Sequence, residues 1–156
     1  MTLDRTDREI LRCLQSDARI SNLELAERVN LSPTPCARRV KKLEDEGYIK
    51  GSTTILDAEM LGLNLTAYIA VSMERHTHEQ FEKFEKRVVE FPEVVSCSVV
   101  TGRAEDYLLK VVVRNMKHYE EFLLSRLNRL PGVSNVHTSF ELRNITPSRG
   151  LPISGD

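Results

Sequence analysis

Four basic side chains gather on one short segment, residues 31–47, and follow two closely spaced prolines at its head. Guanidinium and ammonium groups at this density are the groups with which proteins contact the phosphates of nucleic acids. Hydroxyl side chains at the start of the same segment add donors for phosphate oxygens. The candidate DNA-contacting residues are therefore Ser32, Thr34, Pro35, Arg38, Arg39, Lys41 and Lys42.

The two prolines predict where a helix begins. The first N–H groups of a helix have no acceptor within it, so a proline there loses no hydrogen bond, and its fixed φ suits a helix start. Either Ser32 caps the helix with Pro33 as its first residue, or Thr34 caps it before Pro35. Gly47 provides the stop.

The segment has two different faces when it is wound at about 100° per residue. Cys36, Val40 and Leu43 fall on one side and must face a core. Most of the basic side chains fall broadly opposite, with Arg39 flanking the apolar stripe. Acidic residues are confined to the last turn, where the helix dipole disfavours negative charge. This placement leaves the first turn free of carboxylates and is what we expect if the start of the helix meets phosphate.

Two further helices precede this segment. Residues 4–16 have the apolar spacing of an amphipathic helix, and Ser21 with Glu24 forms a capping box for the next one. We expect Tyr48–Lys50 and Ser52–Leu56 to be wing strands that turn near Gly51. This order predicts a winged helix-turn-helix, whose third helix enters a DNA groove. The alternative is a charged surface helix without a partner.

The remainder of the chain alternates between strand and helix periods. Its order predicts a four-stranded antiparallel sheet with both helices on one face, the ferredoxin-like βαββαβ arrangement. The fold class is therefore α+β, with three segments: residues 1–50 for the helix-turn-helix, 51–63 for wing strand and linker, and 64–156 for the ferredoxin-like domain. The expected strands are residues 65–73, 94–100, 107–113 and 133–142, and the expected helices are 77–91 and 115–130.

The second and third strands of this sheet are apolar on both sides. Val94–Val100 and Tyr107–Val113 contain few polar residues, although a sheet that is solvated on one face should alternate. We infer that the free face is covered by a second copy of the chain. Such a homodimer would present two recognition helices to two DNA half-sites.

Other chemistry is excluded or disfavoured. The three cysteines include no C-x-x-C pair, and the four histidines are part of no metal-ligand pattern, so we expect no metal and no cofactor. Nucleophile elbows and phosphate loops are absent. Because there is no signal segment and no membrane-length apolar run, we expect a cytoplasmic protein without a membrane partner. The net charge of −1 means that any polyanion site depends on local arrangement.

At this point the two halves together resemble the Lrp/AsnC family of "feast/famine" transcriptional regulators, over roughly residues 2–153. The resemblance rests on the joined segments "LDRTDREILRCLQSDARISNLELAERVNLSPTPCARRVKKLEDEGYIKG", "TGRAEDYLLKV" and "LPGVSNVHTSFEL". The runs "LSPTPC" and "LPGV" look most like the leucine-responsive branch. The resemblance implies dimers that assemble further, often to octamers, and that bind free amino acids between dimers. It also implies recognition of imperfect palindromic double-stranded DNA and an effector such as leucine or methionine.

The resemblance further implies an effector site at the loop 101–107. Gly102, Asp106 and Tyr107 match the family's Gly…Asp-Tyr pattern, with one more intervening residue than is usual, and Thr138 and Ser139 match positions that face the same site. Arg103 could meet an α-carboxylate, and Glu105 or Asp106 an α-ammonium group. The alternative is a solvated hairpin turn. The candidate effector-binding residues are Gly102, Arg103, Glu105, Asp106, Tyr107, Thr138 and Ser139.

Two other functions compete with an amino-acid-responsive regulator. Sirohaem decarboxylases resemble the family in both halves, but here His137 and Tyr107 are the only suggestive pair, and the basic face of the third helix would have no role. We therefore expect no enzymatic activity. An architectural protein that wraps DNA around an octamer is the other alternative, and it overlaps with regulation.

Overall fold

The computed structural model describes residues 2–102, 104–146 and 150–154. The chain divides into two compact units. One comprises Met1–Ile55 together with Thr146–Asp156, and the other comprises Leu56–Ile145. The sequence prediction placed residues 146–156 in the second domain, whereas the structure groups this C-terminal segment with the first unit.

Three helices build the first unit: α1 (Arg5–Ser16), α2 (Asn22–Arg28) and α3 (Pro33–Asp45). Capping boxes begin the first two, from Asp4 on α1 and from Ser21 on α2, and the second of these was predicted. The helices enclose a small core whose fully buried members include Ile10, Cys36 and Leu43. Burial of Cys36 and Leu43 in this core leaves the basic side of α3 exposed to solvent.

The start of α3 follows the first of the two predicted alternatives. Ser32 is the N-cap and Pro33 the first helical residue, but the Ser32 side chain makes no capping hydrogen bond. At the other end Gly47 has a φ of 79°, and the Tyr48 amide donates to the Leu43 carbonyl. The glycine therefore ends the helix in the left-handed conformation that it tolerates best.

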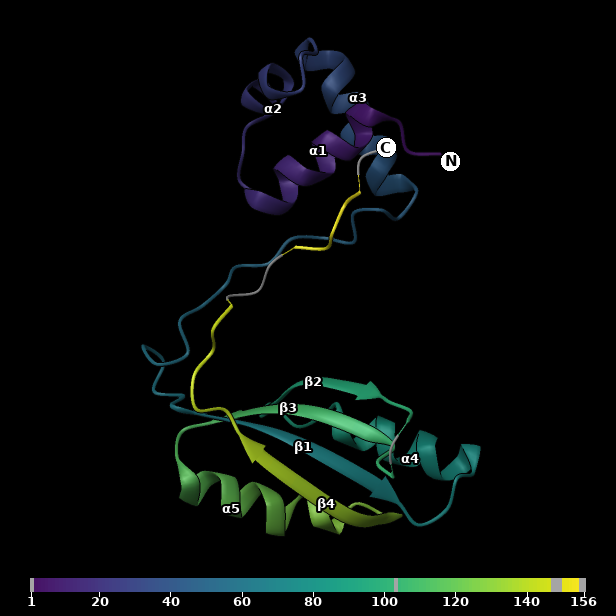
Figure 1. The fold of residues 1–156 in the computed structure, drawn as a ribbon, viewed down its shortest axis with the longest axis vertical. Coiled ribbons are helices and arrows are strands. Elements are labelled where there is room, and N and C mark those ends of the chain that lie inside the picture. The colour runs from purple at the N-terminus through teal and green to yellow at the C-terminus, as the bar shows by residue number, and fades with distance from the viewer. Residues whose placement is uncertain (1, 103, 147–149, 155–156) are drawn as a thin grey trace. The chain divides into compact units, whose positions relative to one another are not determined.

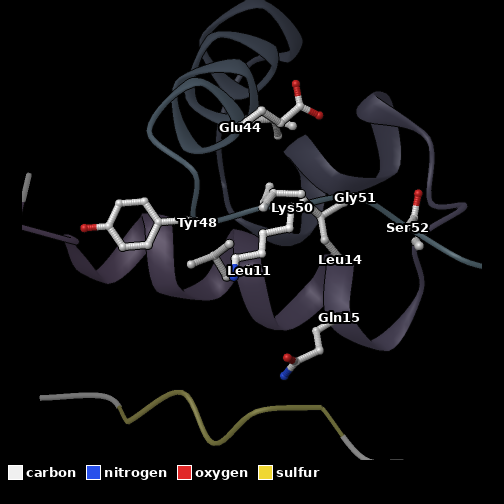
Figure 2. A pocket seen from close by; sticks show the side chains of 11 residues that line it. Leu11, Leu14, Gln15, Glu44, Tyr48, Lys50, Gly51 and Ser52 are labelled. Atoms are coloured by element: carbon white, nitrogen blue, oxygen red, sulfur yellow. The ribbon is translucent and has the colours of Figure 1, made fainter. Parts of the chain in front are cut away.

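The predicted wing strands are wrong for this chain. Residues 47–64 contain no strand in the structure. A two-stranded ribbon is marginal in water without a third strand or a helix to cover it. Residues 48–52 of this segment instead line a hollow of about 270 Å³, together with Leu14 of α1 and Glu44 of α3 (Figure 2).

The second unit is the predicted four-stranded antiparallel sheet with helices on one side (Figure 1). The strand order is β2-β3-β1-β4, so β3 and β1 are central and β2 and β4 are edges. In chain order the elements are β1 (Leu65–Met73), α4 (His78–Val88), β2 (Val94–Val99), β3 (Tyr107–Val113), α5 (Met116–Ser125), a 3-10 turn (Leu127–Arg129) and β4 (Val133–Phe140).

Alternation on the central strands separates two faces of this sheet. On β1, Ile69 and Val71 point toward α4 and α5 and are fully buried, together with Phe84 of α4. On the opposite face Leu108 lies beside Ala70, and Lys110 lies over the Tyr68 ring. The helix-free face is thus mixed rather than uniformly apolar, and much of its apolar surface comes from β3.

A buried carboxylate fastens α5 to the start of β2. Glu93 is 8% exposed, and both of its oxygens accept from Nη1 of Arg126 at 2.9 Å. His118 Nε2 lies 3.1 Å from the same carboxylate. Full pairing of this kind is what a buried charge requires, because an unpaired one would carry a large desolvation cost.

Candidate DNA-binding surface and effector loop

The outward face of α3 carries most of the residues predicted to contact DNA. Arg38, Lys41 and Lys42 are exposed, while Cys36 and Leu43 are buried on the opposite side. The first turn of the helix contains no acidic residue. Ser32, Thr34 and Pro35 are also exposed at its N-terminal end. An exposed helix N-terminus with cationic side chains behind it suits an anion such as a phosphate.

The two lysines of α3 form long ion pairs with acidic residues at the end of the helix. Lys41 Nζ lies 3.6 Å from Asp45, and Lys42 Nζ lies 3.9 Å from Glu46. The two lysine side chains remain 75% and 59% exposed. Exposed pairs of this kind contribute little free energy, so a phosphate can replace the carboxylates at small cost.

Arg39 occupies a different environment from the other basic residues. Its Nη1 donates to Asp4 at 2.6 Å and to Asp7 at 2.7 Å. Asp7 is buried, and Asp4 caps α1. Arg39 therefore joins the start of α1 to the middle of α3 and neutralises two carboxylates beside the basic face. The pairing makes Arg39 a residue that positions α3.

Asn22 of α2 is a second positioning residue, which the sequence analysis missed. Its side-chain Nδ2 donates to the carbonyl of Pro33 at 2.9 Å. This bond fixes the start of α3 against α2. The residue follows directly after the N-cap Ser21, but no local pattern in the sequence indicates that its partner lies on the next helix.

The predicted effector loop closes the hairpin between β2 and β3. The Val100 amide donates to the Asp106 carbonyl at 2.9 Å, and Gly102 has a φ of 102° at the exposed tip. Glu105 is half-buried. Arg103, which we expected to meet an α-carboxylate, lies outside the described residues. The positive φ gives Gly102 a clear conformational role, since other residues are strained there.

Asp106 anchors this loop to the end of β1. Its Oδ2 accepts from the Met73 amide at 2.7 Å, and its Oδ1 lies 2.8 Å from His76 Nε2. Both carboxylate oxygens thus have protein partners in the single chain. The role of His76 was missed in the sequence, because the thirty-residue separation hides the pairing.

Tyr107 is part of the core rather than the surface. It is fully buried, and its hydroxyl donates to Glu85 Oε1 of α4 at 2.8 Å. Burial is the main cause that raises the pKa of this hydroxyl, and the bond to Glu85 adds to it. The side chain therefore holds α4 against β3.

Thr138 and Ser139 of β4 point to opposite faces of the sheet. Thr138 pairs with Ile69 and contacts the Tyr119 hydroxyl on the helix side. Ser139 pairs with Tyr68, whose side chain lies on the helix-free face. Adjacent strand residues always alternate, so the strand prediction already contained this difference. Thr138 also lines a hollow of about 360 Å³ along β4.

The described part of the chain contains neither a metal-binding group nor a membrane-spanning helix. Within it, no group of three or more His, Cys, Asp or Glu side chains could hold a metal ion. No helix there is both long enough and apolar enough to pass through a bilayer.

These features define a class of protein: a helix-turn-helix regulator with a separate ligand-binding domain. The winged helix-turn-helix DNA-binding family matches residues 3–50, and the Lrp/AsnC ligand binding domain family matches residues 66–151. The chain belongs to the Lrp/AsnC family of transcriptional regulators.

Curated relatives are similar in sequence to this chain over nearly its whole length. The chain is 43% identical to the Bkd operon transcriptional regulator of Pseudomonas aeruginosa, covering 97% of this chain and 98% of that one. It is 42% identical to the leucine-responsive regulatory protein of Escherichia coli, covering 97% and 92%. These relatives are regulators, which confirms the prediction that the chain is a regulator and not an enzyme.

Solved structures show the same architecture. A transcriptional regulator from Neisseria meningitidis in complex with L-Met superposes with a TM-score of 0.92 at 42% identity, covering 97% of each chain. An AsnC family regulator from Agrobacterium tumefaciens gives 0.90 at 35% identity, covering 96% and 97%. The predicted two-domain fold is thereby confirmed.

Replacing Arg39 with alanine should lower the free energy of unfolding at pH 7 by about 2 kcal/mol, because the buried Asp7 loses a charged partner. Arg39 also helps to hold the pKa of Asp4 below its ordinary value of 3.8, after the larger effect of the Asp7 amide. A lowered pKa contributes stability above that value and loses it in acid. The difference between wild type and Arg39→Ala should therefore shrink below about pH 4.

Urea unfolding followed by circular dichroism at several pH values measures this difference. Lys42→Ala is the matched control, because its exposed pair with Glu46 is worth at most about 0.5 kcal/mol. Equal stability of the two variants at pH 7 would contradict a positioning role for Arg39.

Proposed function

We propose that this regulator binds imperfect palindromic DNA as a dimer-based oligomer in the cytoplasm and responds to a free amino acid, leucine or methionine. The observation that carries the proposal is the exposed basic face of α3, held in place by Arg39 and Asn22. The relative solved with L-Met supports an amino-acid effector.

Phosphate contacts would supply most of the DNA affinity. Arg38, Lys41 and Lys42 extend from one exposed face of α3, and the two lysines have only long, solvated ion pairs. Ser32 and Thr34 add hydroxyl donors at its front end. Because such contacts release counterions, binding should weaken steeply as salt rises. Arg39 contributes mainly by orienting the helix and by neutralising Asp4 and Asp7.

The helix-free face of the sheet is the proposed dimer surface. Leu108 is 41% exposed on a central strand, where a monomeric sheet would normally carry a polar residue. Ala70 and Val112 lie on the same face. A second copy placed on this face would bury these side chains and bring two recognition helices to one palindrome. Further assembly to an octamer is part of the same proposal.

The effector would bind at the loop 101–107 once dimers have assembled. In the single chain Asp106 is engaged with Met73 and His76, so Glu105 is the better candidate for an α-ammonium group. Arg103 remains the candidate for the α-carboxylate. Asp106 and Tyr107 would then shape the loop, and Thr138 would contribute from the hollow along β4.

Replacing Arg38 with alanine should weaken DNA binding by about 1 kcal/mol, or roughly fivefold, and reduce the slope of log affinity against log salt by about one. The reason is the loss of one phosphate contact. Fluorescence anisotropy with promoter DNA at several salt concentrations measures both values. Lys86→Ala on α4 is the matched control and should leave both unchanged. Unaltered binding by Arg38→Ala would show that α3 does not contact DNA.

The purified protein should sediment as a dimer or a larger species. A charge placed on the free face, Leu108→Glu, should shift it toward the monomer because the carboxylate would have to be buried without a partner. Leu124→Glu, on the exposed side of α5, should leave the mass unchanged. Analytical ultracentrifugation makes the comparison, and a wild-type monomer would refute the dimer.

A screen of the twenty amino acids by thermal shift should identify one or a few stabilising ligands. At a hundred times its dissociation constant, a ligand that binds only the native state adds about 2.7 kcal/mol of stability. Glu105→Gln should lose most of this gain, whereas Glu120→Gln on α5 should keep it. A stabilisation that survives in Glu105→Gln would place the effector elsewhere.

A further inference from the structure

The outer side of α1 holds an extended segment of the chain. Arg8, Arg12 and Gln15 are spaced so that they project from one side of the helix. Each of the three side chains donates to a backbone carbonyl between residues 151 and 154. This C-terminal segment, residues 150–154, belongs to the same compact unit as α1.

The contact with Gln15 is reciprocal. Its Nε2 donates to the Leu151 carbonyl at 2.8 Å, and the Leu151 amide donates to its Oε1 at 2.7 Å. A side-chain amide thus pairs with a peptide group in the way that two strands pair. Figure 2 shows Gln15 at the border of the hollow, extending toward the C-terminal segment.

The two arginines continue the recognition along the backbone. The Nε and Nη2 atoms of Arg12 donate to the Ile153 carbonyl at 3.3 and 3.0 Å, and Nη1 of Arg8 donates to the Ser154 carbonyl at 3.1 Å. Leu151 leaves its side chain 78% exposed, whereas Ile153 is half-buried. These contacts of α1 therefore bind the backbone of the C-terminal segment more than its side chains.

Gly150 makes the close approach possible. A Cβ atom built on it would lie 2.0 Å from Cδ of Gln15 and 2.2 Å from its Nε2. Any other residue would have to displace the side chain that forms the reciprocal pair. The glycine and the glutamine are thus matched to each other, although they lie near opposite ends of the sequence.

We propose that this side of α1 is a peptide-docking surface whose occupant is the chain's own C-terminal segment. Docking makes the segment a part of the DNA-binding unit, so that two stretches of the chain lead from this unit to the sheet: the linker before β1 and the residues after β4. The inner side of the same helix is tied to α3 through Arg39. The docked segment therefore contacts the same helix to which Arg39 ties α3.

Hydrogen exchange of the Leu151 amide in the full-length protein, without amino acid or DNA, tests the docking. The amide should be protected in the wild type, and Gln15→Ala should speed its exchange by about tenfold or more. Gly150→Ala should have a similar effect by displacing Gln15. Gln80→Ala, which alters a glutamine of the other unit, should leave Leu151 protected.

Unprotected exchange at Leu151 in the wild type would overturn the proposal, as would equal protection in the wild type and Gln15→Ala. The same measurement on Leu108→Glu distinguishes a segment that comes from the same chain from one that comes from a second copy. Protection that persists in this variant supports docking of the chain's own segment. Protection that disappears at Leu151, while a core amide such as that of Val111 stays protected, would assign the segment to a second copy. Because no effector or DNA is present, the result is independent of the regulatory function.

Discussion

The ion pairs between Arg39 and the two aspartates at the start of α1 are the contact on which the DNA-binding unit depends. Asp4 caps α1, Asp7 is buried, and a single guanidinium nitrogen bonds to both. The small core around Ile10 and Leu43 sets the distance between the helices but has no directional preference. The charged contact supplies that direction, so the exposed basic side chains are presented at a fixed angle.

The two faces of the sheet in the second unit differ in how they are covered. The helix side is a closed core, in which Tyr107 and Phe84 pack at a ring distance of 4.5 Å. The opposite side leaves apolar side chains of the central strands exposed. In the proposed dimer, a second copy would cover this face and would also bring a second DNA-binding helix to the same site.

Residues of the proposed effector loop take separate roles in the single chain. Asp106 and Tyr107 use their polar atoms within the protein, on Met73, His76 and Glu85. The tip of the loop, at Gly102, is exposed. A loop whose base is fixed and whose tip is exposed can respond to a small molecule without disturbing the core beneath it.

The sequence by itself determined the helix start at Ser21, the order of the strands along the chain and the basic face of α3, because caps and periodic burial are local signals. Its two prolines limited the start of α3 to two alternatives, and the structure decided between them. The sequence also contained the alternation that separates Thr138 from Ser139. Only the tertiary structure decided that Arg39 pairs with Asp4 and Asp7, that Asp106 pairs with His76, and that β2 is an edge strand. The absence of wing strands from residues 47–64 and the docking of the C-terminal segment on α1 were decided there too. These features depend on which distant groups the folded chain brings within hydrogen-bonding reach, and no local period records that distance.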